Sequence, residues 1–315
     1  MTTITSPGIY YTMTSSEYFS DPCPRPSLTQ SLAKALLDQS ALHAKYAHPR
    51  LRPAQDADDD EEKEPYRAAL AIGNAAHLLM IGRGKQLAIG EFESWRTNKA
   101  KDFKSEATLA GKVPILATHF SRANEMMQAS RLQLGAAGWK NAFRNGHGEV
   151  VLAWEEDGLW FRTMIDWMTN PTEVYDYKTG GGSFAPHVIG LKMEADGWDV
   201  QAAMHERALD ALDPKGMGKR RFRYAAQENY PPYALVPVEL NEHWLTMGRK
   251  KLEHAIGIWR QCMTSGIWQS YPSMPIVPDY PGYRESQWLD REVAYHDNLA
   301  ALERRPHMLT DFSGG

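Results

Sequence analysis

The feature that most constrains the fold is a change of hydrophobic period near residue 150. Apolar side chains alternate with other residues over 150–154, an acidic turn follows at 155–158, and the alternation resumes over 159–165. Two runs of period two joined by a short turn predict a β-hairpin. A third strand is expected at 173–179, where Gly180, Gly181 and Gly182 end it. The centre of the chain is therefore predicted to contribute three successive strands to one sheet.

Helical patterns flank these strands. The expected elements are a helix capped by Ser27 and running to about Tyr46, helices over 65–81 and 121–134, a helix of about 20 residues through Trp198 to Leu212, strands over 222–226 and 233–239, and a helix over 241–265. Hairpin strands followed by a helical crossover predict a mixed sheet with helices packed on it, of class α/β or α+β. The helix over 65–81 is apolar nearly all round, and Gly73 allows another backbone to approach it.

The charge of the chain is unevenly distributed. Its net charge is -4, which argues against a nucleic-acid partner, but residues 56–64 hold seven acids and one base. The remainder carries +2, and the acidic run is expected to be a solvated connector. We predict an N-terminal helical segment with this connector over 1–64, a core over 65–270, and a C-terminal surface wrap and tail over 271–315.

Several classes of protein are disfavoured. Two cysteines cannot supply a four-cysteine zinc or iron–sulfur site. No apolar run is long enough for a membrane helix, and the N-terminal residues lack the pattern of a secretory signal, so we expect a cytoplasmic protein without a membrane partner. The chain also lacks the GxxxxGK[ST] motif of P-loop ATPases.

The residues that most strongly indicate a catalytic site lie on or next to the predicted third strand. Asp176 and Lys178 are two positions apart and project from one face, and Asp166 ends the preceding strand. Two carboxylates and an ammonium group near one point suit Mg²⁺, or Mn²⁺, and a phosphate. Phosphodiester hydrolysis is the reaction that such a site serves best. A solvent-facing salt bridge is the alternative for this triplet.

The order of these motifs resembles the PD-(D/E)xK nuclease superfamily, in particular its exonuclease-VIII-like (RecE-type) and RecB-type branch. That branch carries histidine, aspartate, (D/E)YK(T) and QxxxY in this order. The matching residues here are His77 within 74–79, Asp166, Asp176 to Thr179, and Gln201, preceded by a serine-rich helix over 27–37. The resemblance covers roughly residues 10–270. It implies a restriction-endonuclease-like core, with a central mixed sheet flanked by helices and an N-terminal helical extension.

The resemblance also implies roles for individual residues. His77, Asp166 and Asp176 would bind the metal with the Tyr177 carbonyl, Lys178 would assist the attacking water, and Gln201 would contact the scissile region or hold Lys178. A buried core histidine is the alternative for His77. Glu149 either helps to hold the site or is a surface carboxylate.

One position departs from the branch. His205 stands where the branch has tyrosine four residues after the glutamine, and it can still donate a hydrogen bond to phosphate. Trp198 and His205 are alternatively packing residues. We expect further DNA contacts from Lys219, Arg220, Arg221 and Arg223, where Phe222 and Tyr224 either stack on a base or belong to a simple strand. The lysines at 99, 101, 104 and 112 form another basic group.

Three functions follow as hypotheses. The first is a Mg²⁺-dependent exonuclease that degrades linear double-stranded DNA. For this exonuclease the resemblance further implies a role in recombination or phage DNA processing, a single-strand annealing protein as partner, and a homo-oligomeric ring. The second is an endonuclease, or a nuclease subunit that needs a helicase. The third is a non-catalytic DNA-binding protein that retains the fold.

Overall fold

A computed structural model describes residues 3–53 and 64–303 of the 315-residue chain. The acidic connector predicted at 56–64 lies, up to residue 63, outside the described residues. The chain divides into two compact units, residues 1–270 and 271–315, and each is described by itself.

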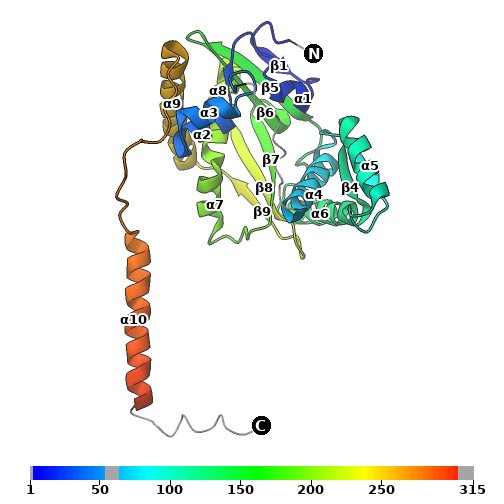
Figure 1. Ribbon diagram of the computed structural model, residues 1–315. Helices are drawn as coiled ribbons and strands as arrows, with labels where there is room; N and C mark the ends of the chain where they lie inside the picture. Colours follow the sequence, from blue (N-terminus) through cyan, green and yellow to red (C-terminus); the bar gives the residue numbers. More distant parts are fainter. Residues whose placement is uncertain (1–2, 54–63, 304–315) are drawn as a thin grey trace. The chain divides into compact units, whose positions relative to one another are not determined.

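The first unit contains a mixed sheet, which lies at its centre (Figure 1). Its order among the described strands is β1-β5-β6-β7-β8-β9, with β2 paired to β6. The strands are β1 (Gly8–Tyr10), β2 (Ser27–Leu28), β5 (His147–Glu156), β6 (Leu159–Asn170), β7 (Glu173–Gly180), β8 (Arg221–Glu228) and β9 (Leu235–Glu239). The hairpin β5–β6 is antiparallel, β7 pairs antiparallel to β6 and parallel to β8, and β9 is antiparallel to β8. The predicted mixed sheet is thereby confirmed.

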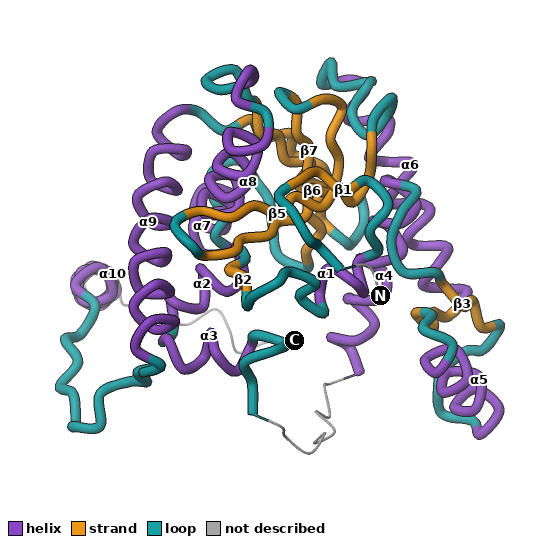
Figure 2. The backbone as a smooth tube through the Cα atoms, turned by 90° about the horizontal axis from the view of Figure 1, so that it is seen from above, coloured by secondary structure: helices purple, strands orange, loops and turns teal. Residues whose placement is uncertain are grey.

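Helices cover both faces of the sheet, as the view from above shows (Figure 2). The helices of the first unit are α1 (Ser15–Phe19), α2 (Gln30–Asp38), α3 (Ala41–Ala47), α4 (Glu64–Ile81), α5 (Asn98–Leu109), α6 (Ala117–Ala136), α7 (Ile189–Asp196), α8 (Trp198–Leu212) and α9 (Glu242–Ser265). One hydrophobic cluster joins α2, α8 and α9 to side chains such as Val174 and Phe222. A second joins α4 and α6 to Tyr175 and Tyr177. Alternate residues of β7 therefore enter opposite cores, as period two requires.

The N-terminal segment is more ordered than its sequence pattern suggested. Ser27 does not cap a helix: it lies in β2, parallel to β6, and Thr29 caps α2 through its side chain. The single helix expected to reach Tyr46 is two helices, because Ser40 adopts an extended backbone and caps α3. Residues before β2 cover the second face of the hairpin, where Ile4 and Tyr18 pack on Trp160.

The predicted helix through Trp198 is also divided in two. Gly197, with φ 73°, ends α7 and begins α8. A left-handed backbone favours glycine and interrupts the hydrogen bonds of a helix. After the break, α8 packs on β5 and β6, where it positions Gln201.

A small separate sheet lies beside α4 and α6. Its strands β3 (Leu87–Gly90) and β4 (Val113–Leu116) are parallel and are connected through α5. Figure 1 shows α4, α5, α6 and β4 together at one side of the first unit.

The second unit contains the helix α10 (Gly282–Glu303), which the sequence pattern had not indicated. Across the described ranges, every helix is too short or too polar to cross a membrane.

Candidate active site

The site lies where β6 and β7 separate. Their pairing joins Trp167–Asn170 to Glu173–Tyr175, and the β7 ladder continues beyond Tyr175 with β8 on its other side. Asp166 precedes the last pair, and its Oδ2 accepts the backbone N–H of Tyr177 at 3.1 Å. A carboxylate thus replaces the neighbouring strand as hydrogen-bond partner, which fixes Asp166 between the two strands.

His77 reaches this carboxylate from α4. Its Nε2 lies 3.4 Å from Asp166 Oδ2. The approach of α4 to the sheet depends on Gly73, since a Cβ there would lie 3.0 Å from Thr179 Oγ1. His77 is therefore a partner of the predicted site, and the alternative of a core histidine bound to a backbone carbonyl is not what the structure shows.

Asp176 and Lys178 meet on the opposite side of β7. Lys178 Nζ lies 2.8 Å from Asp176 Oδ1. Gln201, on α8, donates its Nε2–H to Asp176 Oδ2 at 2.6 Å. Gln201 thus holds the aspartate rather than the lysine. Asp176 is only 2% exposed, so the D-x-K triplet is not a solvent-facing salt bridge.

Two aromatic rings support the lysine. Trp198 and Tyr224 stack with centroids 4.9 Å apart, and Lys178 Nζ lies 6.0 Å and 5.8 Å from their respective centroids. The Tyr224 hydroxyl donates to the Trp198 carbonyl at 2.9 Å. Trp198 is a packing residue here, and the rings fix where the ammonium group can lie.

The environment separates the charge states of these groups. Burial would raise the pKa of Asp166, but the charge and hydrogen bond of His77, together with Lys178, lower it to about 2. Burial and the neighbouring Asp166 raise the pKa of Asp176. Burial would lower the pKa of Lys178, but the two carboxylates raise it. Asp166 is therefore ionised and Lys178 protonated at neutral pH.

Glu149 belongs to the same region. It is 5% exposed, so the surface alternative is wrong. Burial raises the pKa of the Glu149 carboxyl, and the positive charges of His77 and Arg83 offset this rise only in part. A cavity of about 320 Å³ is lined by Glu149, His77 and Tyr177, and by Ser15 and Phe19 of α1.

The donor atoms match a hard divalent cation in type but are not assembled around one point. Over residues 3–53 and 64–303, the His, Cys, Asp and Glu side chains form no group of three or more that could hold a metal ion. Asp166 is engaged by His77, and Asp176 by Lys178 and Gln201. Asp176 Oδ1 is buried and makes no hydrogen bond within the described structure beyond its ion pair with Lys178. The two carboxylates supply oxygen ligands of the kind that Mg²⁺ and Mn²⁺ prefer, whereas the imidazole of His77 is a ligand more typical of other metals.

The predicted DNA-binding residues have different surroundings. Arg220 is 8% exposed and donates to Asp210 Oδ1 at 2.7 Å, as well as to two backbone carbonyls. Arg223 pairs with Glu239 at 2.9 Å. Arg221 is exposed, 3.9 Å from Glu239, and Lys219 is exposed. Arg220 therefore holds the turn before β8 and does not present its charge to DNA.

Of the two alternatives for Phe222 and Tyr224, the structure shows the simple strand: both belong to β8 and their side chains are in the core, where they cannot stack on a base. His205 is 1% exposed. Burial and the charge of Lys178 lower its pKa to about 3. A neutral, buried imidazole at this position does not reach a phosphate, so the expected contact from His205 is not supported.

Sequence reasoning missed several residues of the cavity wall. Asn74, Gly84 and Lys85 line it, and a Cβ on Gly84 would lie 3.5 Å from Glu149 Oε1. Gly84 has φ 135°, a backbone that disfavours other residues. The glycines on either side of Arg83 were the available signal.

Comparison with known proteins relates the fold to a nuclease structure. No family model matches the chain, and no curated protein matches its sequence. Among solved structures, the chain is similar to a candidate exonuclease from Eubacterium rectale, with a TM-score of 0.55 and 13% identity over 85% of this chain and 95% of that one. LHK-Exo in complex with dAMP gives a TM-score of 0.23 at 11% identity, over 64% and 98% of the two chains. The first likeness shows a shared fold.

Proposed function

We propose that this chain is a divalent-metal-dependent exonuclease that hydrolyses phosphodiester bonds of linear double-stranded DNA. The observation that carries the proposal is that two groups of contacts lie where β6 and β7 separate: His77 with Asp166, and Asp176 with Lys178 and Gln201. The fold shared with the Eubacterium rectale candidate exonuclease supports a nuclease, and the motif order supports the exonuclease-VIII-like branch.

Each residue has a distinct part in the proposal. His77, Asp166 and Asp176 would hold Mg²⁺ or Mn²⁺, with the Tyr177 carbonyl as a further ligand. Such a cation supplies Lewis acidity and lowers the pKa of a bound water. Lys178 remains protonated because two carboxylates surround it, so it orients water and offsets charge on the phosphate rather than removing a proton. Gln201 keeps Asp176 turned toward the site.

The test compares wild type with Asp176→Asn, which keeps the size of the side chain and removes its charge. Asp157→Asn is the matched control, because Asp157 is 73% exposed in the β5–β6 turn. End-labelled linear DNA and closed circular DNA are incubated with Mg²⁺, Mn²⁺ or EDTA. Circular dichroism verifies that both variants are folded.

We expect wild type and D157N to degrade linear DNA alone, EDTA to stop the reaction, and D176N to lower the rate at least about a hundredfold. Cutting of closed circles would favour the endonuclease. Absence of cleavage by wild type with either metal would leave the non-catalytic DNA-binding protein. The role in recombination or phage DNA processing, the annealing partner and the ring stay predictions from the resemblance.

A further inference from the structure

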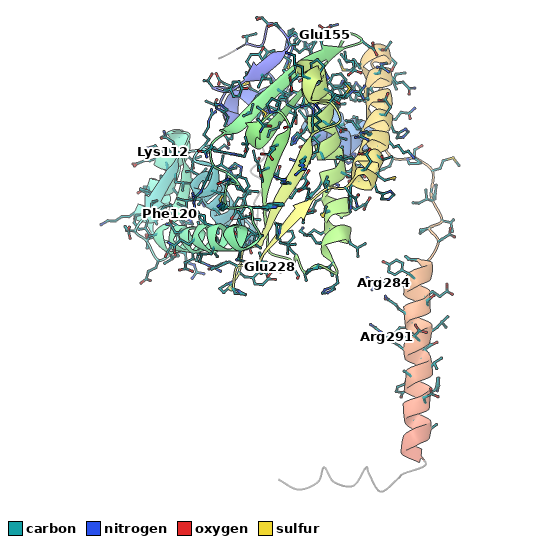
Figure 3. All side chains as sticks on the ribbon, turned by 180° about the vertical axis from the view of Figure 1, so that it is seen from behind. Lys112, Phe120, Glu155, Glu228, Arg284 and Arg291 are labelled. Carbon is teal, nitrogen blue, oxygen red and sulfur yellow. The ribbon has the colours of Figure 1, made fainter. Side chains whose placement is uncertain are left out.

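A cavity next to the site is walled by the small sheet and α5. It has a volume of about 710 Å³ and lies between residues 93–104 and 113–119 on one side and α4 on the other. Figure 3 labels Lys112 and Phe120 on this side of the first unit. The proposed catalytic residues do not line it.

Its wall is basic. Arg96, Lys101 and Lys104 line the cavity, and Glu93 is the acid among the lining residues. None of these three bases forms an ion pair with a carboxylate in the described part of the chain. Arginines elsewhere are compensated, such as Arg207 by Glu156 and Arg249 by Glu206. Uncompensated cations around a hollow favour an anionic ligand from outside the chain.

An aromatic ring is fixed in the same wall. Trp95 lines the cavity and stacks with Phe103, with centroids 6.3 Å apart and planes at 10°. Phe92 lies 5.6 Å from Phe103. Lys104 Nζ lies 5.7 Å from the centroid of Trp95. An aromatic ring beside lysines that have no carboxylate partner in the described structure provides the two contacts that an unpaired nucleotide requires, one for its base and one for its phosphate.

The cavity adjoins the cavity of the site. Leu70 and Asn74 line both it and the cavity that contains His77, Glu149 and Tyr177. Both residues belong to α4, with His77 one helical turn beyond Asn74. The two cavities are therefore neighbours along α4, which places the basic wall beside the proposed catalytic groups.

We propose that this cavity binds single-stranded DNA next to the scissile bond, with Lys101 and Lys104 on phosphates and Trp95 against a base. The inference rests on the proposed nuclease function and names the form of the substrate that the site receives. A duplex hides the faces of its bases, whereas an unpaired strand offers them to an aromatic ring.

Binding is measured separately from cleavage. Fluorescence anisotropy in EDTA follows a labelled oligodeoxythymidylate of about 12 nucleotides, and a blunt duplex in parallel. The variants are K101E/K104E and the matched control K99E/K112E, whose lysines are exposed on α5 and the following turn and do not line the cavity. Both double variants change the net charge by the same amount, so a difference in affinity between them reports the effect of where the lysines lie.

We expect K101E/K104E to weaken single-strand binding at least about tenfold at moderate salt, and to lower the slope of log affinity against log salt by about 0.7 for each lost phosphate contact. K99E/K112E should change the single-strand affinity less than about threefold. K101E/K104E should lose less affinity for the duplex than for the single strand.

Three results would overturn the inference: no single-strand binding by wild type, equal losses in the two double variants, or a duplex loss as large as the single-strand loss. Cleavage of linear DNA by wild type in any of these cases would leave the proposed function standing. Conversely, position-dependent binding without cleavage in Mg²⁺ or Mn²⁺ would remove the nuclease proposal and keep the binding site.

Discussion

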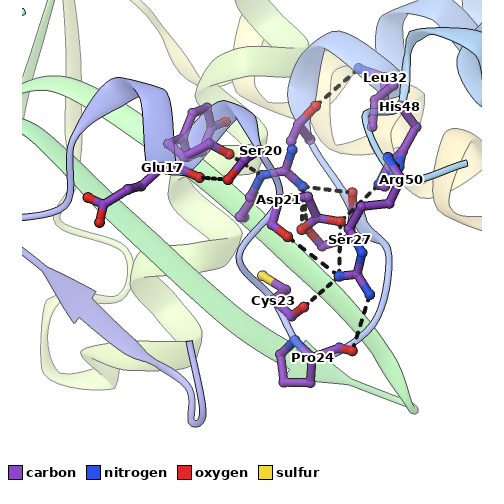
Figure 4. Close-up of polar contacts among 12 residues, drawn as sticks. Glu17, Ser20, Asp21, Cys23, Pro24, Ser27, Leu32, His48 and Arg50 are labelled. Carbon is purple, nitrogen blue, oxygen red and sulfur yellow. Dashed lines mark hydrogen bonds and ion pairs between the residues drawn. The ribbon is translucent and has the colours of Figure 1, made fainter. Parts of the chain in front are cut away.

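Asp21 shows how a single buried charge organises the N-terminal segment. Its side chain lies 2.9 Å from Arg162 Nη1 and 3.1 Å from His48 Nε2, and Ser27 Oγ donates to it at 2.7 Å. Figure 4 shows Asp21 with Ser27, His48 and Arg50 around it. Burial would raise the pKa of Asp21, but the His48 hydrogen bond, Arg162 and Ser27 lower it.

Asp21→Asn should therefore destabilise the protein in a pH-dependent way. At pH 7 the change leaves buried Arg162 without its counter-charge, which costs roughly 3–5 kcal/mol of unfolding free energy. Because the folded pKa is below the unfolded value of about 3.9, the stabilisation is present above that pH and is lost as pH falls through the folded pKa. Urea unfolding from pH 7 to pH 3 checks this.

The control for this prediction is Asp38→Asn. Asp38 is 50% exposed and pairs with Lys34 at the surface, so its loss should change stability by less than about 0.5 kcal/mol. A D21N variant as stable as D38N at pH 7, or a difference from wild type that grows below pH 4, would contradict the account.

Single residues differ in how far the sequence reveals them. Asp166, Asp176 and Lys178 were found because strand alternation and a turn fix which residues share a face. Arg220 was misread, because a run of basic residues does not show which one faces inward, and its partner Asp210 is ten positions earlier on a helix. Glu149 stayed ambiguous because its backbone, with φ 49° within β5, departs from the regular strand geometry that would fix the face its side chain takes.

At the scale of elements, the strands were predicted more accurately than the helix boundaries. Period two and turn residues located β5 to β9. The breaks at Ser40 and Gly197 were missed, because a helical apolar pattern runs across both while the cap and the left-handed backbone depend on tertiary packing.

The contact between α8 and α9 gives a prediction with an internal control. Gly248 lies in α9, and a Cβ there would lie 2.1 Å from the Asp199 carbonyl oxygen. Gly248→Ala should lower the unfolding free energy by about 1–3 kcal/mol through overpacking. Gly257, in the same helix, has open space around it, so Gly257→Ala should raise it by about 0.5–1 kcal/mol. Urea unfolding distinguishes the two, and two changes of the same sign would refute the packing argument.

For the whole molecule, the described hydrophobic clusters consist of residues before 270. A chain ending at Ser270 should therefore keep the thermal midpoint of the full chain within about 2 °C. A chain ending at Gly266 should melt several degrees lower, because it lacks Trp268, whose ring lies 5.4 Å from that of Trp259, and the Gln269 carbonyl that accepts from Leu42. Differential scanning calorimetry measures both midpoints. A large drop for the longer form would show that stability depends on residues beyond 270.

The N-terminal wall of the site has a consequence for the order of folding during synthesis. Ser15 and Phe19 line the cavity that contains His77 and Glu149, yet the carbonyl of Ser27, which anchors this segment, accepts a hydrogen bond from Arg162, 135 residues later in the chain. The contacts of this segment with Arg162 cannot form until β6 has left the ribosome, and closing so long a loop is slow. A nascent chain in which β6 and β7 have just paired would thus bring Asp166 and Asp176 together before the wall of Ser15 and Phe19 encloses them.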